Sequence, residues 1–314
     1  MSNQGYLDQP DLHVRAPWRS ALLTFPGNLK GALKAAHEDP SKTLFGVGQG
    51  IPSPFVTKVI ASTRPDFIWL DVEHGMYDRL ALHDCIHAVQ HHSEGKTMAI
   101  VRVPKHDEVS LTTALDAGAS GIVIPCCESA EEVEKIIKTI YYPPVGRRSF
   151  SPWVFTPGIS DTSLYEEDSF NMKTANRHIA VIAQIESVKG VKNAREIAAV
   201  EGVSAMLFGP GDFSADAGIP LKVGGEPHPT LAAAMGEWAA AGRENGIPLV
   251  GAAMGPGMVP SLIEQGFRAI VVSMDVWGLA NMIHGQVEQG RKDAQELGKP
   301  SEKEQSNGVD GESK

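Results

Sequence analysis

The stretch Ala205-Met206-Leu207-Phe208-Gly209-Pro210-Gly211-Asp212 joins a short apolar run to a turn that carries one carboxylate. Four apolar residues in a row are typical of a buried strand, and two glycines around a proline end it. Because glycine has no Cβ, a ligand can approach the backbone of this turn closely. Asp212 adds an anionic oxygen that can hold a cation or a proton. The same residues also suit an ordinary turn, so the interpretation depends on which other strand ends lie beside this one.

Apolar runs of the same kind recur along the chain and alternate with amphipathic segments. They are short, rich in valine and isoleucine, and nearly continuous, as expected of parallel strands buried on both faces. The predicted strands are Leu44–Gly48, Phe67–Val72, Met98–Val103, Gly121–Pro125, Ile179–Ile185, Ala205–Phe208, Pro248–Ala253 and Ala269–Met274. Eight strand–helix units in about 250 residues predict an α/β fold, the (β/α)8 TIM barrel. A doubly wound sheet is the main alternative, but no strand opens into a G-x-G-x-x-G turn.

Helical periodicity follows most of the predicted strands. The predicted helices are Ser53–Thr63, Leu80–His92, Asp107–Ala117, Ala130–Ile140, Lys189–Val200, Thr230–Asn245, Met258–Gln265 and Trp277–Leu297, the last of which is long enough to extend beyond its own barrel. The catalytic barrel is therefore expected over residues 41–297. Residues 1–40 are expected to form a polar arm that ends in a short helix at Leu29–His37. Residues 298–314 are poor in apolar side chains and are expected to form a disordered tail.

A long insertion interrupts the alternation before the fifth predicted strand. Residues 141–178 greatly exceed the usual length of a connection between a helix and a strand. The insertion starts at a helix end, on the face of the barrel opposite the strand carboxyl ends. We therefore expect it to wrap towards an active site and also to form part of an oligomer contact.

Composition and charge exclude several classes of partner. The chain has 314 residues, a formal net charge of -10 and a sequence pI of about 5.6, which argue against nucleic acid or an anionic membrane. No apolar run approaches the roughly 18 residues of a membrane span, and the N-terminus lacks a signal pattern. The three cysteines, Cys85, Cys126 and Cys127, fit free thiols in a reducing compartment better than disulfides or zinc. We therefore expect a cytoplasmic protein.

Charged residues follow several predicted strands at the same end. Asp71 lies at the end of the second strand and His74 follows it, Arg102 lies in the third, Glu186 follows the fifth and Asp212 the sixth. Catalytic groups of a TIM barrel lie at the carboxyl ends of its strands, and buried charges are costly unless they are paired or bind a metal. The alternatives are a structural ion pair with Arg102 and a packed His74 without a catalytic role.

These residue types suit an α-keto acid bound to a divalent cation. Glu186 and Asp212, from neighbouring strands, can hold Mg²⁺, or alternatively Mn²⁺ or Co²⁺, and leave positions for substrate oxygens. Imidazole titrates near neutral pH, so His74 fits a general base, and Arg102 is a fixed cation for a developing enolate. Gln184 lies one strand repeat before Glu186 and can hydrogen-bond the substrate. The amides of Gly209–Asp212 are expected to receive its carboxylate.

The segments around these residues resemble the HpcH/HpaI family of metal-dependent pyruvate aldolases. The resemblance extends from about residue 43 to 290 and is carried by Trp69–His74, Val101-Arg102, Leu115–Gly118, Tyr142–Arg148, Gln184–Glu186 and Gly209–Asp212. It implies a TIM barrel and a homo-oligomer, usually a hexamer, in which the final helix is exchanged between subunits. It also implies the site roles: His74 as base, Asp116 raising its basicity, and Arg102 stabilising the transition state. Glu186 and Asp212 are implied as metal ligands, and Gln184, Gly211 and Asp212 as substrate-binding residues. The strand-end position of Asp71 adds it to the catalytic set, and the bare backbone of Gly209 adds that residue to the substrate-binding set.

Further segments are similar to a fungal member of this family that decarboxylates oxaloacetate on Mg²⁺ and adds the enolate to a 2-pyrone. They are Phe45–Val47, Ile51–Ser53, Pro104–Leu111, Arg147–Trp153, Pro260–Gly266 and Asp275–Leu279. Phe150, Pro152 and Trp153 match the pocket walls of that enzyme. Cys126 stands where its active-site histidine is expected, and Phe170 where a pyrone-binding tyrosine is expected. Because unmet hydrogen bonds discriminate strongly between substrates, both changes are expected to weaken pyrone binding.

The sequence thus predicts a Mg²⁺-dependent carbon–carbon lyase that forms a pyruvate enolate from an α-keto acid. Oxaloacetate decarboxylation and aldol cleavage or addition are the expected reactions, with an aldehyde or a 2-pyrone as acceptor. Decarboxylation followed by annulation onto a 2-pyrone is the alternative. A non-catalytic barrel retained for binding or assembly is a lesser alternative of another class.

Overall fold

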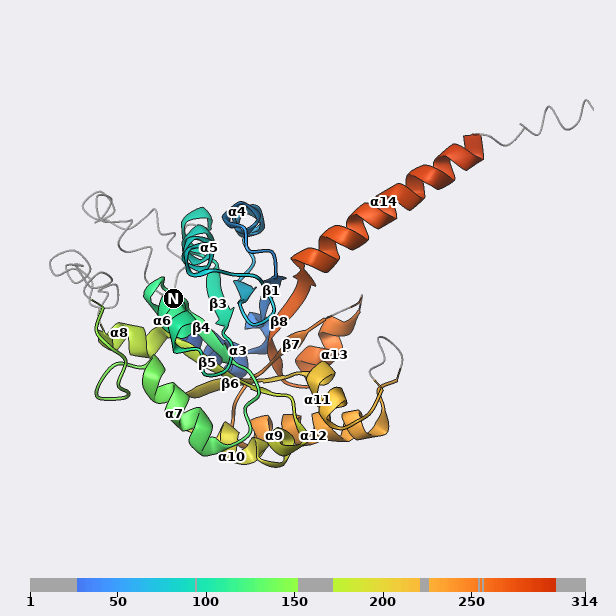
Figure 1. Cartoon of the computed structure of the whole chain (residues 1–314). Helices are drawn as coiled ribbons and strands as arrows, with labels where there is room; N and C mark the ends of the chain where they lie inside the picture. The colour runs from blue at the N-terminus through green and yellow to red at the C-terminus, as the bar shows by residue number, and fades with distance from the viewer. Residues whose placement is uncertain are drawn as a thin grey trace, which may run out of the picture. The chain divides into compact units, whose positions relative to one another are not determined.

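A closed barrel of eight parallel strands forms the centre of the protein (Figure 1). The computed structural model describes residues 27–93, 95–151, 172–220, 226–253, 255 and 257–297. Each strand pairs with the next one along the chain, and the last pairs with the first. The strands are β1 (Leu44–Gln49), β2 (Phe67–Asp71), β3 (Met98–Arg102), β4 (Gly121–Ile124), β5 (Ala180–Ile185), β6 (Val203–Phe208), β7 (Leu249–Ala252) and β8 (Phe267–Met274). The TIM barrel is confirmed, and the doubly wound sheet is excluded.

Successive residues of these strands enter two different cores. Ile100, Val123 and Ile182 belong to the cluster inside the barrel, whereas their neighbours Val101 and Ile122 belong to the cluster between the strands and the surrounding helices. Side chains of a strand alternate between its two faces, so a strand that is covered on both faces needs apolar residues at every position. This requirement explains the continuous apolar runs that predicted the strands.

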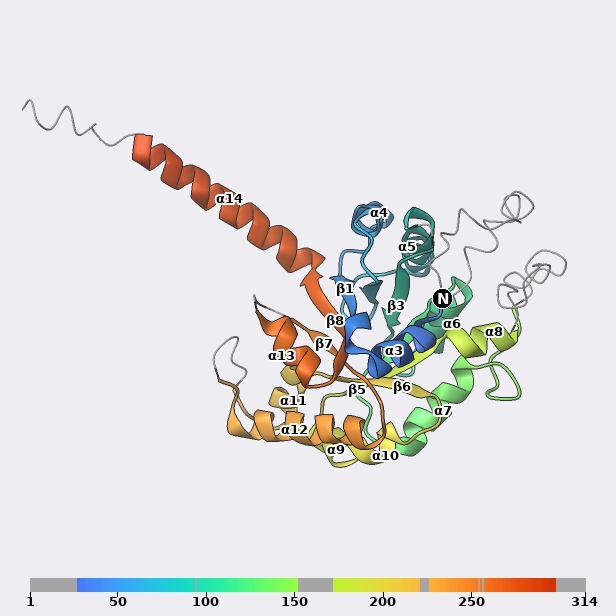
Figure 2. The same ribbon diagram turned by 180° about the vertical axis from the view of Figure 1, so that it is seen from behind.

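Helices follow the strands and cover the outside of the barrel (Figures 1 and 2). They are α4 (Pro54–Ser62), α5 (Arg79–His92), α6 (Glu108–Asp116), α7 (Ala130–Ile140), α9 (Val188–Lys192), α10 (Ala194–Ala198), α11 (Pro210–Asp216), α12 (Pro229–Glu244) and α13 (Met258–Glu264). The single helix expected over Lys189–Val200 is divided at Asn193. The Asn193 side chain donates to the Glu128 carbonyl over 2.7 Å, and such local hydrogen bonds compete with a continuous helix.

The short helix α3 (Leu29–Glu38) becomes part of the barrel core, although the sequence placed it in a polar arm. Leu29 and Leu33 are almost completely buried and join the cluster inside the barrel. Leu29 packs where a side chain at Gly121, the first residue of β4, would otherwise stand, so α3 closes the amino end of the barrel. The next residues, Pro40–Lys42, form one 3₁₀ turn, η3, before β1.

The insertion between α7 and β5 includes a helix that the sequence did not predict, α8 (Met172–His178). The two ends of the insertion are tied together, because the Tyr142 backbone both donates to and accepts from the Asn176 side chain, over 2.7 and 2.9 Å. Residues 152–171 are outside the described part of the chain. The residues Pro152, Trp153 and Phe170, predicted to line the acceptor pocket, are among them.

The final helix, α14 (Asp275–Leu297), begins a second unit of the chain at Asp275. None of its residues is buried in the single chain. Its predicted exchange between subunits stays a prediction. None of the helices within the described ranges is both long enough and apolar enough to cross a membrane.

Candidate active site

A bidentate ion pair joins the carboxyl ends of β2 and β3. Asp71 and Arg102 are register partners in the sheet, and the Arg102 Nε and Nη2 atoms lie 2.9 and 2.6 Å from the two carboxylate oxygens of Asp71. Both side chains are 13% exposed, and the guanidinium carbon lies 5.6 Å from the centre of the Trp69 ring. The ion pair that the sequence analysis considered as an alternative is thus present, and it fixes the orientation of the Arg102 cation.

Two further carboxylates act on Arg102. Its Nη1 atom lies 3.3 Å from Glu73 Oε2, and Glu186 is close enough to affect its charge. Burial opposes the charge on Arg102, but the hydrogen bond and the charge of Asp71, followed by the charges of Glu73 and Glu186, raise the pKa of the guanidinium above its ordinary value. Burial also raises the pKa of Glu73, and the positive charge of Arg102 partly offsets this rise. The cation is therefore permanent and surrounded by acids.

Glu186 is a buried carboxylate held by three neighbours. Its side chain follows β5 and is almost completely buried. The Cys126 N–H donates to Glu186 Oε1 over 2.7 Å, and the Gln184 amide donates to Oε2. Gly209 lies against the same carboxylate, since a Cβ at this position would be 2.4 Å from Oε2. The first glycine of the turn after β6 is therefore required by the close approach of Glu186.

The rest of this turn is more open. The Gly209 N–H donates to the Ile185 carbonyl over 2.9 Å, so this amide is already used. A side chain at Gly211 would meet no atom within 4 Å. Asp212 lies in the first turn of α11 and is exposed. Glu186 and Asp212 thus follow the paired strand ends of β5 and β6, with Glu186 buried and Asp212 open to solvent.

The donor atoms at this end of the barrel fit a hard divalent cation. Glu186 and Asp212 offer carboxylate oxygens, and the buried Gln184 Oε1 has no hydrogen-bond partner among the described residues. Magnesium prefers oxygen ligands and keeps several water molecules. In the part of the chain that the structure describes, no three histidine, cysteine, aspartate or glutamate side chains are arranged to hold a metal. A cation here would therefore depend on two carboxylates, water and the substrate.

His74 and Asp116, which the resemblance paired, lie apart in the single chain. The His74 side chain is 66% exposed; its backbone N–H lies 3.4 Å from Asp71 Oδ1 and its ring nitrogen 3.8 Å from Glu73. Asp116 ends α6, and its carboxylate accepts from Arg148 over 2.7 Å. Because α6 runs back antiparallel to the strands, its end lies at the opposite face of the barrel.

The expected acceptor pocket is described only in part. Phe150 is 52% exposed. The Cys126 thiol lies beside Glu186, and burial, followed by the hydrogen bond and charge of Glu186, raises its pKa to about 12. Cys126 is therefore a neutral thiol, and it cannot replace the cationic form of a histidine.

Two residues at the site were missing from the predicted set. Glu73 belongs to the Trp69–His74 segment, but its position between Arg102 and His74 depends on the turn after β2. Lys105 donates to the Cys126 carbonyl over 2.6 Å. Two signals pointed to it: it belongs to the Pro104–Leu111 segment that is similar to the fungal family member, and it lies three residues after the strand-end Arg102.

Comparisons with known proteins identify the family of the chain. The HpcH/HpaI aldolase/citrate lyase family matches residues 51–281. The chain is 58% identical to macrophomate synthase, over 94% of this chain and 100% of that one, with a TM-score of 0.85. It is 32% identical to a hydroxypyruvate/pyruvate aldolase of Delftia acidovorans, over 62% of this chain and 68% of that protein. It is 30% identical to another of the same name from Paraburkholderia phytofirmans, over 81% and 94%. The chain therefore belongs to the HpcH/HpaI aldolase/citrate lyase family and is an enzyme of its pyruvate aldolase and lyase class.

Proposed function

We propose that this enzyme uses Mg²⁺ to form a pyruvate enolate from an α-keto acid, by decarboxylating oxaloacetate or by cleaving an aldol. One observation carries the proposal: the buried carboxylate Glu186 lies beside the fixed cation Arg102, at the end of the barrel where Asp212 is exposed. Such an arrangement suits a substrate that has an anionic head and develops negative charge on a neighbouring oxygen.

Glu186 and Asp212 would hold the cation, which would polarise the ketone of the bound keto acid. The residues of the chain then have separate tasks. Asp71 fixes the plane of the Arg102 guanidinium, which faces the developing enolate oxygen. Gln184 keeps Glu186 in position, and the open space at Gly211 admits the substrate carboxylate.

His74 is the base for the proton transfer. Its exposed ring can exchange protons with solvent and also reach a substrate that lies over the site. In oxaloacetate decarboxylation, the bond between the methylene carbon and its carboxylate breaks, the electron pair remains in the enolate, and carbon dioxide leaves. Protonation of the enolate carbon then gives pyruvate.

Proton exchange at the methyl group of pyruvate tests this proposal without any acceptor. In D2O, deuterium should replace the methyl protons in the presence of enzyme and Mg²⁺, and EDTA should stop the exchange. Glu186→Gln and Asp212→Asn should lower Mg²⁺ affinity at least tenfold and lose most of the exchange. Full exchange in both variants would refute the metal ligands, and no exchange by the wild type would refute the enolate step.

A second candidate is annulation of the enolate onto a 2-pyrone. The 58% identity to macrophomate synthase over the whole length of that enzyme supports it. The neutral thiol of Cys126 and the apolar Phe170 oppose it, because both replace expected polar groups. The enolate half of the site is common to both candidates, so they differ only in the acceptor.

Mass spectrometry of the products distinguishes the two candidates. Oxaloacetate and a carboxylated 2-pyrone are incubated with the enzyme, and any product whose formation needs both substrates is sought. Cys126→His and Phe170→Tyr together should raise the yield of such a product severalfold. If neither the wild type nor this double variant forms one, the annulation is excluded and the simpler lyase remains.

The enzyme is also proposed to act as a homo-oligomer, a hexamer by its resemblance to the family. Apolar side chains support this proposal on two separate surfaces of the single chain. Phe55, Val59 and Leu80 are more than half exposed on α4 and α5, and α14 exposes an apolar stripe of its own. A partner copy that covers these surfaces would remove them from water.

A further inference from the structure

The connection from β3 to α6 points a lysine back towards the buried carboxylate of the site. After Arg102 the chain turns at Pro104, whose carbonyl accepts from the Asp107 N–H over 3.1 Å, and His106 takes a left-handed conformation with φ 65. Asp107 then caps α6 by accepting from two backbone N–H groups. This turn directs Lys105 away from α6 and towards the turn after β4.

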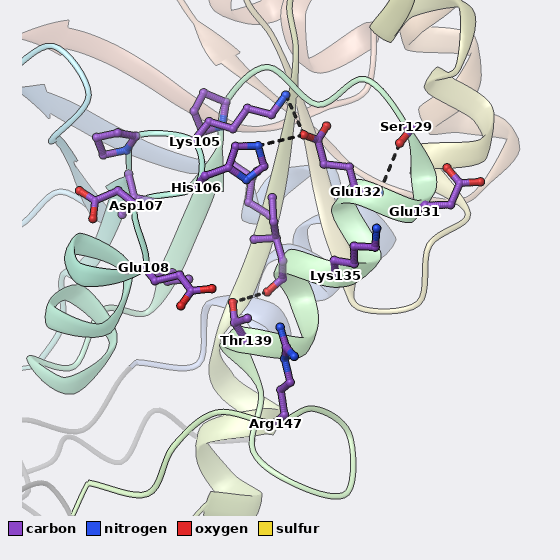
Figure 3. Close-up of a pocket in the computed structure, with 16 residues that line it drawn as sticks. Lys105, His106, Asp107, Glu108, Ser129, Glu131, Glu132, Lys135, Thr139 and Arg147 are labelled. Carbon is purple, nitrogen blue, oxygen red and sulfur yellow. Dashed lines mark hydrogen bonds and ion pairs between the residues drawn. The ribbon is translucent and has the colours of Figure 1, made fainter.

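The ammonium group of Lys105 contacts two neighbouring segments of the chain. Its Nζ atom lies 2.9 Å from Glu132 Oε1 on α7 and donates to the Cys126 carbonyl over 2.6 Å. The His106 ring lies 3.3 Å from the same Glu132 oxygen. Figure 3 shows Lys105 and His106 converging on Glu132 at one end of a cavity of about 370 Å³, whose other wall includes Lys135 one turn further along α7.

Cys126 occupies a backbone conformation that needs outside support. Its φ of 48 lies in the left-handed region, which side chains other than glycine and asparagine seldom adopt. Residues in such conformations persist only when their surroundings fix them. Here the Cys126 N–H donates to Glu186, its carbonyl accepts from Lys105, and the next N–H donates to the Gln184 carbonyl over 2.9 Å. Two of these three contacts come from β5 and the residue directly after it, and that of Lys105 comes from the connection after β3.

We propose that Lys105 is a positioning residue of the metal site, because it holds the Cys126–Cys127 peptide and thereby the left-handed conformation of Cys126 in which the Cys126 N–H donates to Glu186. The proposal rests on the proposed function, in which Glu186 is a metal ligand. Lys105 does not touch the substrate; it acts through the two peptide units that meet at the Cys126 Cα. Without it, only the Cys127 N–H holds the Cys126–Cys127 peptide, so Cys126 can leave its left-handed conformation. Oε1 of Glu186 then loses its donor, and the carboxylate no longer has one orientation.

The test compares Lys105→Met with Lys135→Met in the full-length protein. Both changes remove one ammonium group from the same cavity, but only the first removes the contact to Cys126. Lys105→Met should weaken Mg²⁺ binding, measured by calorimetry, at least tenfold and should speed amide hydrogen exchange at Cys126. Lys135→Met should change neither, and Lys105→Arg should restore part of the affinity because it keeps a cationic donor.

Equal Mg²⁺ affinities and equal Cys126 exchange in the two methionine variants would overturn the proposal. The exchange measurement also separates it from the proposed function. If the wild type bound no Mg²⁺, the metal assignment would fail, and unchanged exchange at Cys126 in Lys105→Met would overturn the role of Lys105 as well. Faster exchange with a thermal midpoint near that of the wild type supports it, because a general loss of stability would lower the midpoint.

Discussion

Glu186 leaves no room for a side chain at position 209. A Cβ there would lie 2.4 Å from one oxygen of Glu186 and 2.7 Å from its Cβ, both far inside van der Waals contact. The backbone of Gly209 cannot retreat easily, because its N–H is bonded to the Ile185 carbonyl. The position of the buried Glu186 carboxylate therefore depends on the absence of a side chain at Gly209, which follows the neighbouring strand.

We therefore predict that Gly209→Ala displaces Glu186. The extra methyl group should lower Mg²⁺ affinity at least tenfold and reduce pyruvate deuterium exchange by a similar factor, because the carboxylate must leave its hydrogen bonds. Calorimetry and NMR measure these effects. Gly236→Ala on α12, where a Cβ meets no atom within 4 Å, should retain wild-type affinity. An unchanged affinity in Gly209→Ala would mean that Glu186 does not bind the metal.

The guanidinium group of Arg102 is a second group whose exact orientation the structure fixes. Asp71 bonds both Nε and Nη2, so a lysine at position 102 could satisfy only part of this geometry. We predict that Arg102→Lys lowers kcat for oxaloacetate decarboxylation by about 10²-fold, the order expected for loss of one preorganised charge, with a smaller change in KM. Steady-state kinetics above the Mg²⁺-catalysed background measures both constants. A change confined to KM would indicate that Arg102 only binds the ground state.

At the scale of elements, most of the barrel could be predicted from the sequence. Continuous apolar runs are required wherever a strand is covered on both faces, so every strand was found within one or two residues of its bounds. The exceptions depend on tertiary contacts. Leu29 and Leu33 look like an ordinary amphipathic turn until the open barrel end provides a partner, and Asn193 divides a helix only because Glu128 lies nearby.

Part of the candidate site could be predicted in the same way. Asp71 and Arg102 end their strands and Glu186 directly follows one, and strand ends of a barrel meet at one face. Lys105 lies in a connection, and Asp116 at a helix end, so their positions depend on turns that no pattern specifies. The Asp116 carboxylate in fact accepts from Arg148. Its predicted effect on His74 would require a second copy of the chain.

Helix α5 contains a histidine whose charge opposes folding. Burial, followed by the neighbouring His83 and His91, lowers the pKa of His87 to about 4, while Asp84 acts weakly in the other direction. The rings of His83 and His87 are 4.0 Å apart. In the unfolded chain, His87 takes up a proton near its ordinary pKa of 6.5, but in the folded chain it does so only near pH 4. Its contribution to stability is therefore complete above pH 6.5 and is lost as the pH falls towards 4.

We predict that His87→Gln makes the stability less sensitive to acid. Between pH 7.5 and 5, the free energy of unfolding of the wild type should fall by on the order of 1 kcal/mol more than that of the variant, a figure reduced for partial exposure of the ring. Urea unfolding at the two pH values measures the difference. His92→Gln, on the exposed last turn of the helix, serves as the control. Parallel pH profiles of wild type and His87→Gln would contradict the prediction.

At the scale of the whole molecule, the apolar side chains that the single chain leaves exposed are the main support for the predicted homo-oligomer. Val276, Leu279, Ile283 and Val287 follow helical spacing on α14, and each is between 46% and 49% exposed. An amphipathic helix gains most of its stability from packing its apolar face, so 23 residues with no buried side chain need a partner. We expect the exposed apolar side chains of α4 and α5 on another copy to cover it.

We predict that the protein in solution is a homo-oligomer, with a mass near six times the 33.6 kDa of the chain, and that α14 holds it together. Ile283→Glu places a charge in the apolar stripe, so it should shift the mass measured by light scattering towards smaller species. Asn281→Glu adds the same charge outside the stripe and should leave the mass unchanged.

Because α14 belongs to a separate unit of the chain and contributes no predicted metal ligand, Mg²⁺ binding by Ile283→Glu should persist if each barrel holds a complete metal site. A dissociated variant that binds Mg²⁺ but no longer exchanges the pyruvate protons would show that the proton-transfer groups depend on assembly, as expected if Asp116 of one copy acts on His74 of another. An Ile283→Glu protein with the mass of the wild type would instead exclude the α14 stripe from the interface.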